Sequence, residues 1–517
     1  MTSRRATHRS LVAATLTVVA GSGVAAAAPQ PSTLGTVDVG RYPDARCNNG
    51  EAATFNYILS TDTGPADQID YRKKWLVVLS GGGGCGDYAS CAARWNESPQ
   101  GPNLDGGPGE HGNMVPDLVT RGFDDHGLLD FDGNPAQLGG GVVGRHANPF
   151  AGPGAGGADG FNRVWINYCS SDSWEGLGTT VAVNAVDFPS VAFDPTNPAL
   201  TSLHFGGARI VDAVIATIMR GEIDGTARPE LVPDDVDGEI VLAGSSAGGG
   251  GTIRNLDTVA HDIATGVVGE FDPAPGVLVY GIVDAATAVG PLATPAGDDG
   301  YAKASFYTNG QPDQVRTDDD CDPAGTNRCY AVGDHVVQNE IATPYFVVQQ
   351  AFDMNIHEDL KAGIAAAIRA NAAAAQAQYP GLFAFAVATF GTPEAAAEAY
   401  IRYKITSQAT TIGAARNNPA GLFIPNYATG WHQLMADSER FYTSQANQWV
   451  GGDHPGSPRL GALYAGTAVS IPVALAAFRQ CVLGNYGAAV DYAGCVTTIY
   501  SPAVDQNARV INSTATP

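Results

Sequence analysis

The feature that most constrains the fold of this chain is a series of apolar, strand-length runs separated by segments with helical spacing. The runs cover residues 75–79, 163–168, 239–243, 277–283 and 345–348. Runs of this kind, with little polar alternation, are typical of strands that are buried on both faces. Between and after them, the apolar spacing of residues 202–220 and the alanine-rich residues 358–378 predict helices. The sequence therefore predicts an α/β fold, with a mostly parallel central sheet and helices on both of its faces.

The glycine content of the chain is high, with 64 glycines and 32 prolines in 517 residues. No collagen-like period is present, so these residues indicate long structured loops. The longest candidate spans residues 95–160, which are rich in Gly, Pro, Asn and Asp. A loop of that length inside a compact domain is usually functional.

The charge balance excludes two classes of partner. The chain carries 28 Lys and Arg against 52 Asp and Glu, a formal net charge of -24. A nucleic-acid partner needs a basic surface that neutralises phosphates. Docking on anionic lipid needs the same sign of charge. We therefore expect no nucleic acid and no membrane among the partners of the mature chain.

The amino terminus has the pattern of an export signal. Arg4, Arg5 and Arg9 precede an apolar stretch at residues 11–19, and small residues follow at positions 25–28. The apolar stretch is short for a bilayer span, so a retained anchor is the weaker interpretation. We predict a signal peptide at residues 1–28, a flexible leader at 29–46, and a secreted or periplasmic protein.

The chain has eight cysteines, and an even number in an exported protein indicates disulfides. Eight cysteines allow 105 pairings, so the spacing does not determine the connectivity. We expect three short loops and one remaining long-range pair, namely Cys85–Cys91, Cys321–Cys329, Cys481–Cys495 and Cys47–Cys169.

The segment from Gly244 to Gly248 has the pattern G-x-S-x-G and follows the apolar run at 239–243. This pattern places a serine on a sharp turn between a strand and a helix, with its hydroxyl exposed above the sheet. The pattern selects Ser246 as a nucleophile, because Ser245 occupies the variable position. The alternative is a glycine turn with a structural role only.

A serine nucleophile on such a turn usually needs an acid and a histidine that follow it in the chain. Asp353 follows the run at 345–348 and is favoured over Asp284, although either carboxylate is also compatible with a helix cap. Among the later histidines, His432 is favoured because it follows a short apolar run and a loop. His454 is the alternative, while His357, four residues after Asp353, is not expected to reach Ser246.

Four consecutive glycines, Gly81 to Gly84, follow the run at 75–79. Glycines at the end of a strand let backbone N–H groups approach a developing oxyanion. The alternative is a phosphate-binding loop, but no Gly-Lys-Ser/Thr sequence follows.

Taken in order, these motifs resemble the pectin acetylesterase/Notum family of secreted serine carboxylesterases. The resemblance covers roughly residues 45–440. It is carried by residues 79–85 with Cys91, 148–150, 162–164, 168–176, 203–210, 244–249, Asp257, 351–353 and 423–432.

The resemblance implies an α/β-hydrolase fold and a serine esterase that needs no cofactor. It implies a catalytic triad of Ser246, Asp353 and His432. It also implies oxyanion donors at Gly82, Gly83 and Ala247.

The chain departs from the family pattern at two places. Gly83 stands where members commonly carry Trp, and Phe205-Gly206-Gly207 stands where they carry Phe-Arg-Gly. Both departures weaken any transfer of substrate identity.

The functional hypothesis is hydrolysis of an O-acyl ester, with deacetylation of an extracellular polysaccharide favoured. A fatty-acyl ester or polyester substrate is one alternative, and a non-catalytic exported binding protein is another. We expect one catalytic domain at residues 47–500 and a tail at 501–517.

Two acidic segments, residues 318–322 and 130–134, carry oxygen ligands of the kind that calcium binds. Neither has the ligand spacing of an EF-hand, so solvated acidic turns are the preferred interpretation and no metal is predicted.

Overall fold

The computed structural model describes a large part of the chain, and the account below concerns these residues only. They are 30–60, 70–96, 114–116, 122–124, 127–128, 150, 160–190, 198–266, 271–286, 315–316, 341–349, 353–378, 390–401, 420–423, 445–446, 448–450, 469–485 and 498–500.

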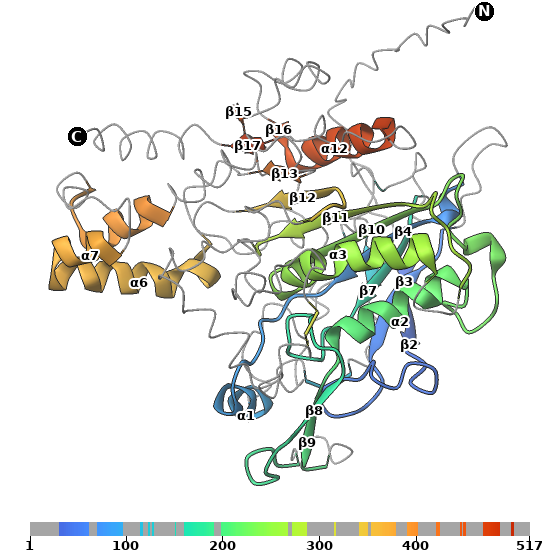
Figure 1. Ribbon diagram of the computed structural model, residues 1–517, viewed down its shortest axis with the longest axis horizontal. Helices are drawn as coiled ribbons and strands as arrows, with labels where there is room; N and C mark the ends of the chain where they lie inside the picture. The colour runs from blue at the N-terminus through green and yellow to red at the C-terminus, as the bar shows by residue number, and fades with distance from the viewer. Residues whose placement is uncertain are drawn as a thin grey trace, which may run out of the picture.

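The main feature of the described part is a ten-stranded sheet with the order β15-β17-β13-β12-β11-β10-β4-β7-β3-β2 (Figure 1). All neighbours from β7 to β17 are parallel, while β2, β3 and β15 pair antiparallel. The strands are β2 Thr33–Thr36, β3 Thr54–Ile58, β4 Lys74–Leu79, β7 Asn162–Ile166, β10 Glu239–Ser245, β11 Leu278–Asp284, β12 Tyr345–Val348, β13 Ala420–Phe423, β15 Gln448–Val450 and β17 Thr498–Tyr500.

The predicted strands form at the positions that their apolar runs indicated, because both faces of the sheet are covered. Side chains alternate between two cores: Trp75 and Val77 of β4 belong to one, and Leu76 and Val78 belong to the other. The helices α2 Gly207–Met219 and α3 Ala247–Thr265 pack on the first face. The helix α12 Ile471–Asn485 packs on the second. The predicted α/β-hydrolase fold is confirmed.

Further helices and strands are present in the described part of the chain, and some of their residues, among them Leu231, Ile364 and Ala375, belong to the first core. These elements are β1 Gln30–Pro31, β5 Gly122–Asp124, β6 Gly127–Leu128, β8 Thr179–Ala182, β9 Ser202–Phe205, β14 Gln445–Ala446, β16 Val469–Ser470, α1 Tyr88–Asn96, α6 Met354–Ala370, α7 Ala372–Gln378 and the 3-10 turns Tyr71–Lys73 and Pro229–Leu231. None of the helices in this part of the chain has the length and hydropathy of a membrane span.

The prediction of a flexible leader at residues 29–46 is wrong for residues 33–46. Thr33–Thr36 forms β2 at the edge of the central sheet, and Val37 and Ala45 are buried. The reason is local packing: Gly35 lies so close to the Phe55 ring that a Cβ there would be 2.3 Å from it. With Leu34 as its one large apolar residue, β2 has no apolar pattern that would predict a strand.

Two predicted helices need new boundaries. Residues 202–205 form β9, which pairs with β8, and the helix begins only at Gly207. Buried and partly buried residues alternate along β9, which is the period of a strand. With four residues, the strand is too short for this alternation to stand out from the helical spacing that follows it. The alanine-rich helix starts earlier than expected, at Met354, and divides at Asn371, whose side chain caps α7 by accepting the N–H groups of Ala373 and Ala374 at 3.0 and 3.1 Å.

Two of the four predicted disulfides are confirmed. Cys47 is bonded to Cys169, and Cys85 is bonded to Cys91. The other two pairs involve Cys321, Cys329 and Cys495, which lie outside the described residues. The acidic segments at 318–322 and 130–134 lie outside them as well.

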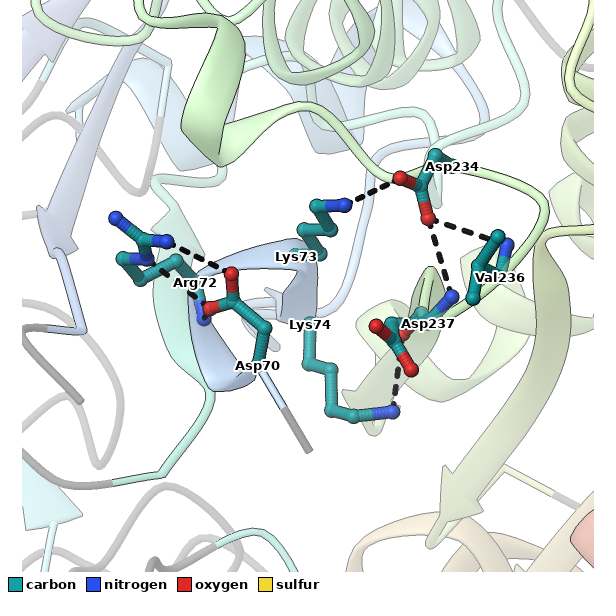
Figure 2. Close-up of polar contacts among 7 residues, drawn as sticks. All are labelled: Asp70, Arg72, Lys73, Lys74, Asp234, Val236 and Asp237. Carbon is teal, nitrogen blue, oxygen red and sulfur yellow. Dashed lines mark hydrogen bonds and ion pairs between the residues drawn. The ribbon is translucent and has the colours of Figure 1, made fainter. Parts of the chain in front are cut away.

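The amino ends of β4 and β10 are held by ion pairs (Figure 2). Lys73 pairs with Asp234, and Arg72 pairs with Asp70 at 2.8 Å. Beside them, the Lys74 ammonium donates to the Asp237 carbonyl at 3.1 Å. It also donates to the buried Glu239 carboxylate, which the figure does not include, at 2.9 Å.

The Glu239 carboxylate also ties α12 to the sheet. It accepts two bonds of 2.7 Å from the Arg479 guanidinium of α12 and one of 2.7 Å from the Tyr280 hydroxyl. Burial would raise the pKa of Glu239. The Arg479 and Lys74 cations outweigh that effect and lower the pKa to about 2.

We predict that Glu239 makes the fold sensitive to acid. Its folded-state pKa lies below the unfolded value of 4.5. The stability it contributes is therefore complete above that value and is lost as the pH falls towards about 2, with a total on the order of 3 kcal/mol. Denaturant unfolding at a series of pH values tests this. The Glu239→Gln variant should be less stable at neutral pH and lose less stability on acidification. An equal slope in both proteins would contradict the assignment.

Candidate active site

Ser246 lies between β10 and α3 in a backbone conformation that few residues adopt. Its φ is 58° and its ψ is -123°. Such a conformation costs about 1–3 kcal/mol for a residue with a Cβ and persists only where the surrounding structure imposes it. The turn therefore has the strained geometry expected of a nucleophile on a strand-to-helix turn.

The glycines of the motif are required because the turn is closely packed. A Cβ on Gly244 would lie 2.2 Å from the Gly248 carbonyl oxygen, and a Cβ on Gly248 would lie 2.0 Å from the Leu79 carbonyl oxygen. Both distances are far inside van der Waals contact. The backbone of the turn thus lies directly against the end of β4.

The turn is held by hydrogen bonds at both of its ends. The N–H of Ser246 donates to the Asp284 carbonyl at 2.9 Å, and the N–H of Gly250 donates to the Ser246 carbonyl at 3.0 Å. Ala247 is the first residue of α3. The N–H groups at the start of a helix have no partner within it, so the position of Ala247 suits a donor to an oxyanion.

The two adjacent serines have different environments. Ser245 is 6% exposed, and its hydroxyl donates to the Asp284 carboxylate on the neighbouring strand. Ser246 is only partly buried. The carboxylate of Asp284, the alternative acid, thus accepts a hydrogen bond from Ser245. Asp284 lies on β11, the strand next to β10, and is the register partner of Ser245.

Asp353 is fully buried between the end of β12 and the start of α6. One strand, β11, separates β10, which leads to Ser246, from β12, which leads to Asp353. Since β10, β12 and β13 are parallel, their carboxyl ends lie at the same edge of the sheet.

His432 follows β13 in the chain but lies outside the described residues. The side chains of His357 and His454 are not described either. The structure therefore brings Ser246 and Asp353 to the same edge of the central sheet. The assignment of His432 as the catalytic base stays a prediction.

The glycine run leaves β4 beside the serine turn. Leu79 of β4 is the register partner of Gly244 in β10. Gly82 and Gly83 have φ values of 133° and 66°, which favour glycine. Gly83 is exposed, and Gly82 is partly buried. The run therefore begins at the same edge of the sheet as the Ser246 turn.

A third segment, the loop at residues 170–176, supports both of these turns. Its residues contribute to the family resemblance, but no role at the site was predicted for them. Trp174 is fully buried, and its indole N–H donates to the Ser80 carbonyl at 3.0 Å. A Cβ on Gly251 of α3 would lie 2.4 Å from the Trp174 Cβ. The loop is linked to the amino-terminal segment by Cys47–Cys169. The sequence signal for this loop was its cluster of small and polar residues directly after the predicted strand at 163–168.

Backbone strain is concentrated at this edge of the sheet. The non-glycine residues with positive φ in the described part of the chain follow β7, β10 or β11, and they are Ser171, Ser173, Trp174, Ser246 and Ala285. Strained residues cluster at functional sites, where the surrounding fold offsets their cost. Their distribution points to the same location as the serine motif.

Buried charges lie beneath the loop. The Arg316 guanidinium bonds the Asp212 carboxylate at 2.8 and 2.7 Å, and Arg254 pairs with Glu175 at 2.8 Å. Asp172 accepts hydrogen bonds from the Ser170 hydroxyl and the Gly207 N–H at 2.6 and 2.8 Å. Burial raises the pKa of Asp172 to about 6 despite these bonds.

A family model described as pectinacetylesterase matches residues 160–380. The resemblance to the pectin acetylesterase/Notum family is confirmed. The matched region contains Ser246 and Asp353 but neither the glycine run at 81–84 nor His432.

Two curated relatives are named palmitoleoyl-protein carboxylesterase NOTUM. The protein of Drosophila melanogaster is 29% identical over 218 residues, which is 41% of this chain and 22% of the relative. The protein of Schmidtea mediterranea is 25% identical over 250 residues, which is 48% of this chain and 34% of the relative. The matches thus span about a third or less of these proteins.

Among solved structures, the chain is similar to the Wnt deacylase Notum from Drosophila in two crystal forms. The TM-scores are 0.49 and 0.47, with 20% and 19% identity. The similarity covers 88% of this chain in both cases, and 93% and 94% of the other chain.

We predict that Gly248→Ala destabilises the protein strongly, because the new methyl group would overlap the Leu79 carbonyl. A loss of about 3 kcal/mol or more in the free energy of unfolding is expected from overpacking at this site. The matched control is Gly363→Ala in α6, where a Cβ meets nothing within 4 Å. It should be stabilising by about 0.5–1 kcal/mol. Similar melting temperatures for the two variants would disprove the close approach.

We predict that Asp172 makes the free energy of unfolding depend on pH in the direction opposite to Glu239. Its folded-state pKa of about 6 is above the unfolded value of 3.8, so its share of the stability is complete below 3.8 and declines as the pH rises through 6. The decline should be on the order of 3 kcal/mol. Unfolding measured between pH 4 and 7 should show a smaller decline for Asp172→Asn than for the unaltered protein. Parallel curves would argue against it.

Proposed function

We propose that this protein is a secreted serine carboxylesterase that hydrolyses an O-acyl ester through an acyl-enzyme. The observation that carries the proposal is the conformation of Ser246, with φ 58° at the junction of β10 and α3. A serine held in that strained conformation, with a helix N-terminus beside it, is suited to nucleophilic attack on a carbonyl.

In the proposed reaction, Ser246 attacks the ester carbonyl while His432 accepts its proton. Asp353 orients His432 and stabilises the charged imidazole. The histidine then returns the proton to the departing alcohol. In the second half, water attacks the acyl-enzyme, the acid is released and the serine regains its proton. No cofactor takes part in these steps.

Backbone N–H groups of Gly82, Gly83 and Ala247 are proposed to stabilise the tetrahedral oxyanion. One such donor is typically worth about 10²–10³ in rate. The support is their location: Gly248 lies against the end of β4, so the glycine run and the start of α3 are neighbours.

The favoured reaction is deacetylation of an extracellular polysaccharide, supported by the description of the matching family model. The net charge of -24 argues against a highly charged polyanion, because like charges repel. Neutral or well-esterified polysaccharide is therefore the preferred substrate.

A fatty-acyl ester is the second candidate, and the names of the two curated relatives favour it. A polyester is a further possibility of the same chemical class. The glycine at position 83 carries no side chain, which leaves space at the proposed oxyanion loop for different acyl groups. A non-catalytic binding protein with this fold is the alternative of a different class.

We also propose export and a single catalytic domain. Two disulfides in the described residues fit an oxidising compartment, as does the predicted signal peptide. One sheet takes strands from Thr33 to Tyr500, so the domain boundary proposed at residue 47 moves to the start of β2.

We predict that Ser246→Ala abolishes both ester hydrolysis and labelling by a fluorophosphonate probe. Ser245→Ala is the matched control, because it removes the hydroxyl of the adjacent residue that contacts Asp284. The control should still be labelled. Hydrolysis by Ser246→Ala at the unaltered rate would refute the proposal, and an unlabelled wild-type protein would favour the binding protein.

The substrate class is tested by a panel of acetylated polysaccharides, p-nitrophenyl esters of increasing chain length, and polyesters. A kcat/KM that is highest for acetyl groups supports the favoured reaction. A maximum at long acyl chains supports the second candidate.

A further inference from the structure

Arg94 of α1 lies between two of the segments that surround the candidate site. One of its terminal nitrogens, Nη2, donates to the Gly82 carbonyl oxygen. Its Nε donates to the Ser171 hydroxyl at 2.9 Å, and its guanidinium lies 6.0 Å from the centre of the Tyr168 ring. One side chain thus bonds the glycine run and the strained loop at the same time.

The glycine run needs such a partner because its backbone has no intrinsic preference for one conformation. Glycine loses more conformational freedom on ordering than any other residue, and four of them are consecutive here. The run is fixed at its far end by the Cys85–Cys91 disulfide and by the Cys85 N–H, which donates to the Ser171 carbonyl at 2.9 Å. Arg94 is three residues beyond Cys91 on the same helix, so it acts on the middle of the run.

Because a peptide bond is planar, the contact of Arg94 with the Gly82 carbonyl also sets the direction of the Gly83 N–H. In a trans peptide, the carbonyl of one residue and the N–H of the next lie in one plane and point in opposite directions. Cis peptides are absent from the described residues. With the Gly82 carbonyl bonded to Arg94, the N–H of Gly83 points away from α1.

We propose that Arg94 is a positioning residue that orients the Gly82–Gly83 peptide so that its N–H serves as an oxyanion donor. This inference rests on the esterase function proposed above. The guanidinium is suited to the role because its planar fork holds two acceptors in a fixed geometry, whereas a lysine ammonium does not. Arg94 itself does not contact the reacting atoms.

The consequence concerns the transition state more than substrate binding. A preorganised donor stabilises the charge that develops on the carbonyl oxygen, and a rotating peptide does so only in part of its conformations. Loss of Arg94 should therefore lower kcat and leave KM largely unchanged.

The test uses Arg94→Met and Arg94→Lys in the full chain, with Arg228→Met as the matched control. Arg228 makes an ion pair with Asp224 at 2.7 Å and is 42% exposed, so its loss changes the net charge equally. Hydrolysis of p-nitrophenyl acetate is measured per active site, counted by complete fluorophosphonate labelling. We expect kcat to fall about 10- to 100-fold in both Arg94 variants, with KM within about twofold and the control unchanged.

A second readout separates orientation from a general structural role. A trifluoromethyl ketone forms a tetrahedral adduct with a serine hydroxyl, so its affinity reports on the oxyanion donors. It should fall with kcat in Arg94→Lys, which keeps the charge and the stem of the side chain. An unchanged kcat per active site, or a rise in KM alone, would overturn the inference, even if Arg94→Met fails to fold. Failure of the proposed function would instead appear as no hydrolysis by the wild type or full activity of Ser246→Ala.

Discussion

The close contact between the Gly248 backbone and the Leu79 carbonyl is the constraint on which the candidate site depends. Parallel pairing of β10 with β4 places Gly244 opposite Leu79, and the absence of side chains at Gly244 and Gly248 lets the two turns meet. The serine on one strand and the glycine run on the next are neighbours only for this reason. A single methyl group at the contact would move one turn away from the other.

The two ends of the central strands are stabilised differently. At the amino ends, ion pairs join β4, β10 and α12, with the Glu239 carboxylate held between Lys74 and Arg479. At the carboxyl ends, the backbone is strained at Ser171, Ser173, Trp174, Ser246 and Ala285. The well-paired end thus offsets the cost of strain at the end that is proposed to react.

Much of this arrangement was readable from local sequence. The apolar runs predicted the parallel strands because burial on both faces leaves little room for polar residues. The G-x-S-x-G motif located the turn, since only glycine fits at positions 244 and 248. The short spacing of Cys85 and Cys91 suggested their disulfide. Polar edge segments were missed, as β2 shows, because an edge strand needs no apolar pattern.

The sequence by itself determined the strand series, the serine turn and the glycine run, because each depends on residues that are adjacent in the chain. Only the tertiary structure decided what surrounds them. Arg94 contacts Gly82 from α1, the helix that the Cys85–Cys91 disulfide links to the glycine run. Ser171 and Trp174 come to the same edge from the loop after β7, 70 or more positions in the sequence from both Arg94 and Ser246. No local pattern encodes these contacts, because they arise from the order of strands in the sheet.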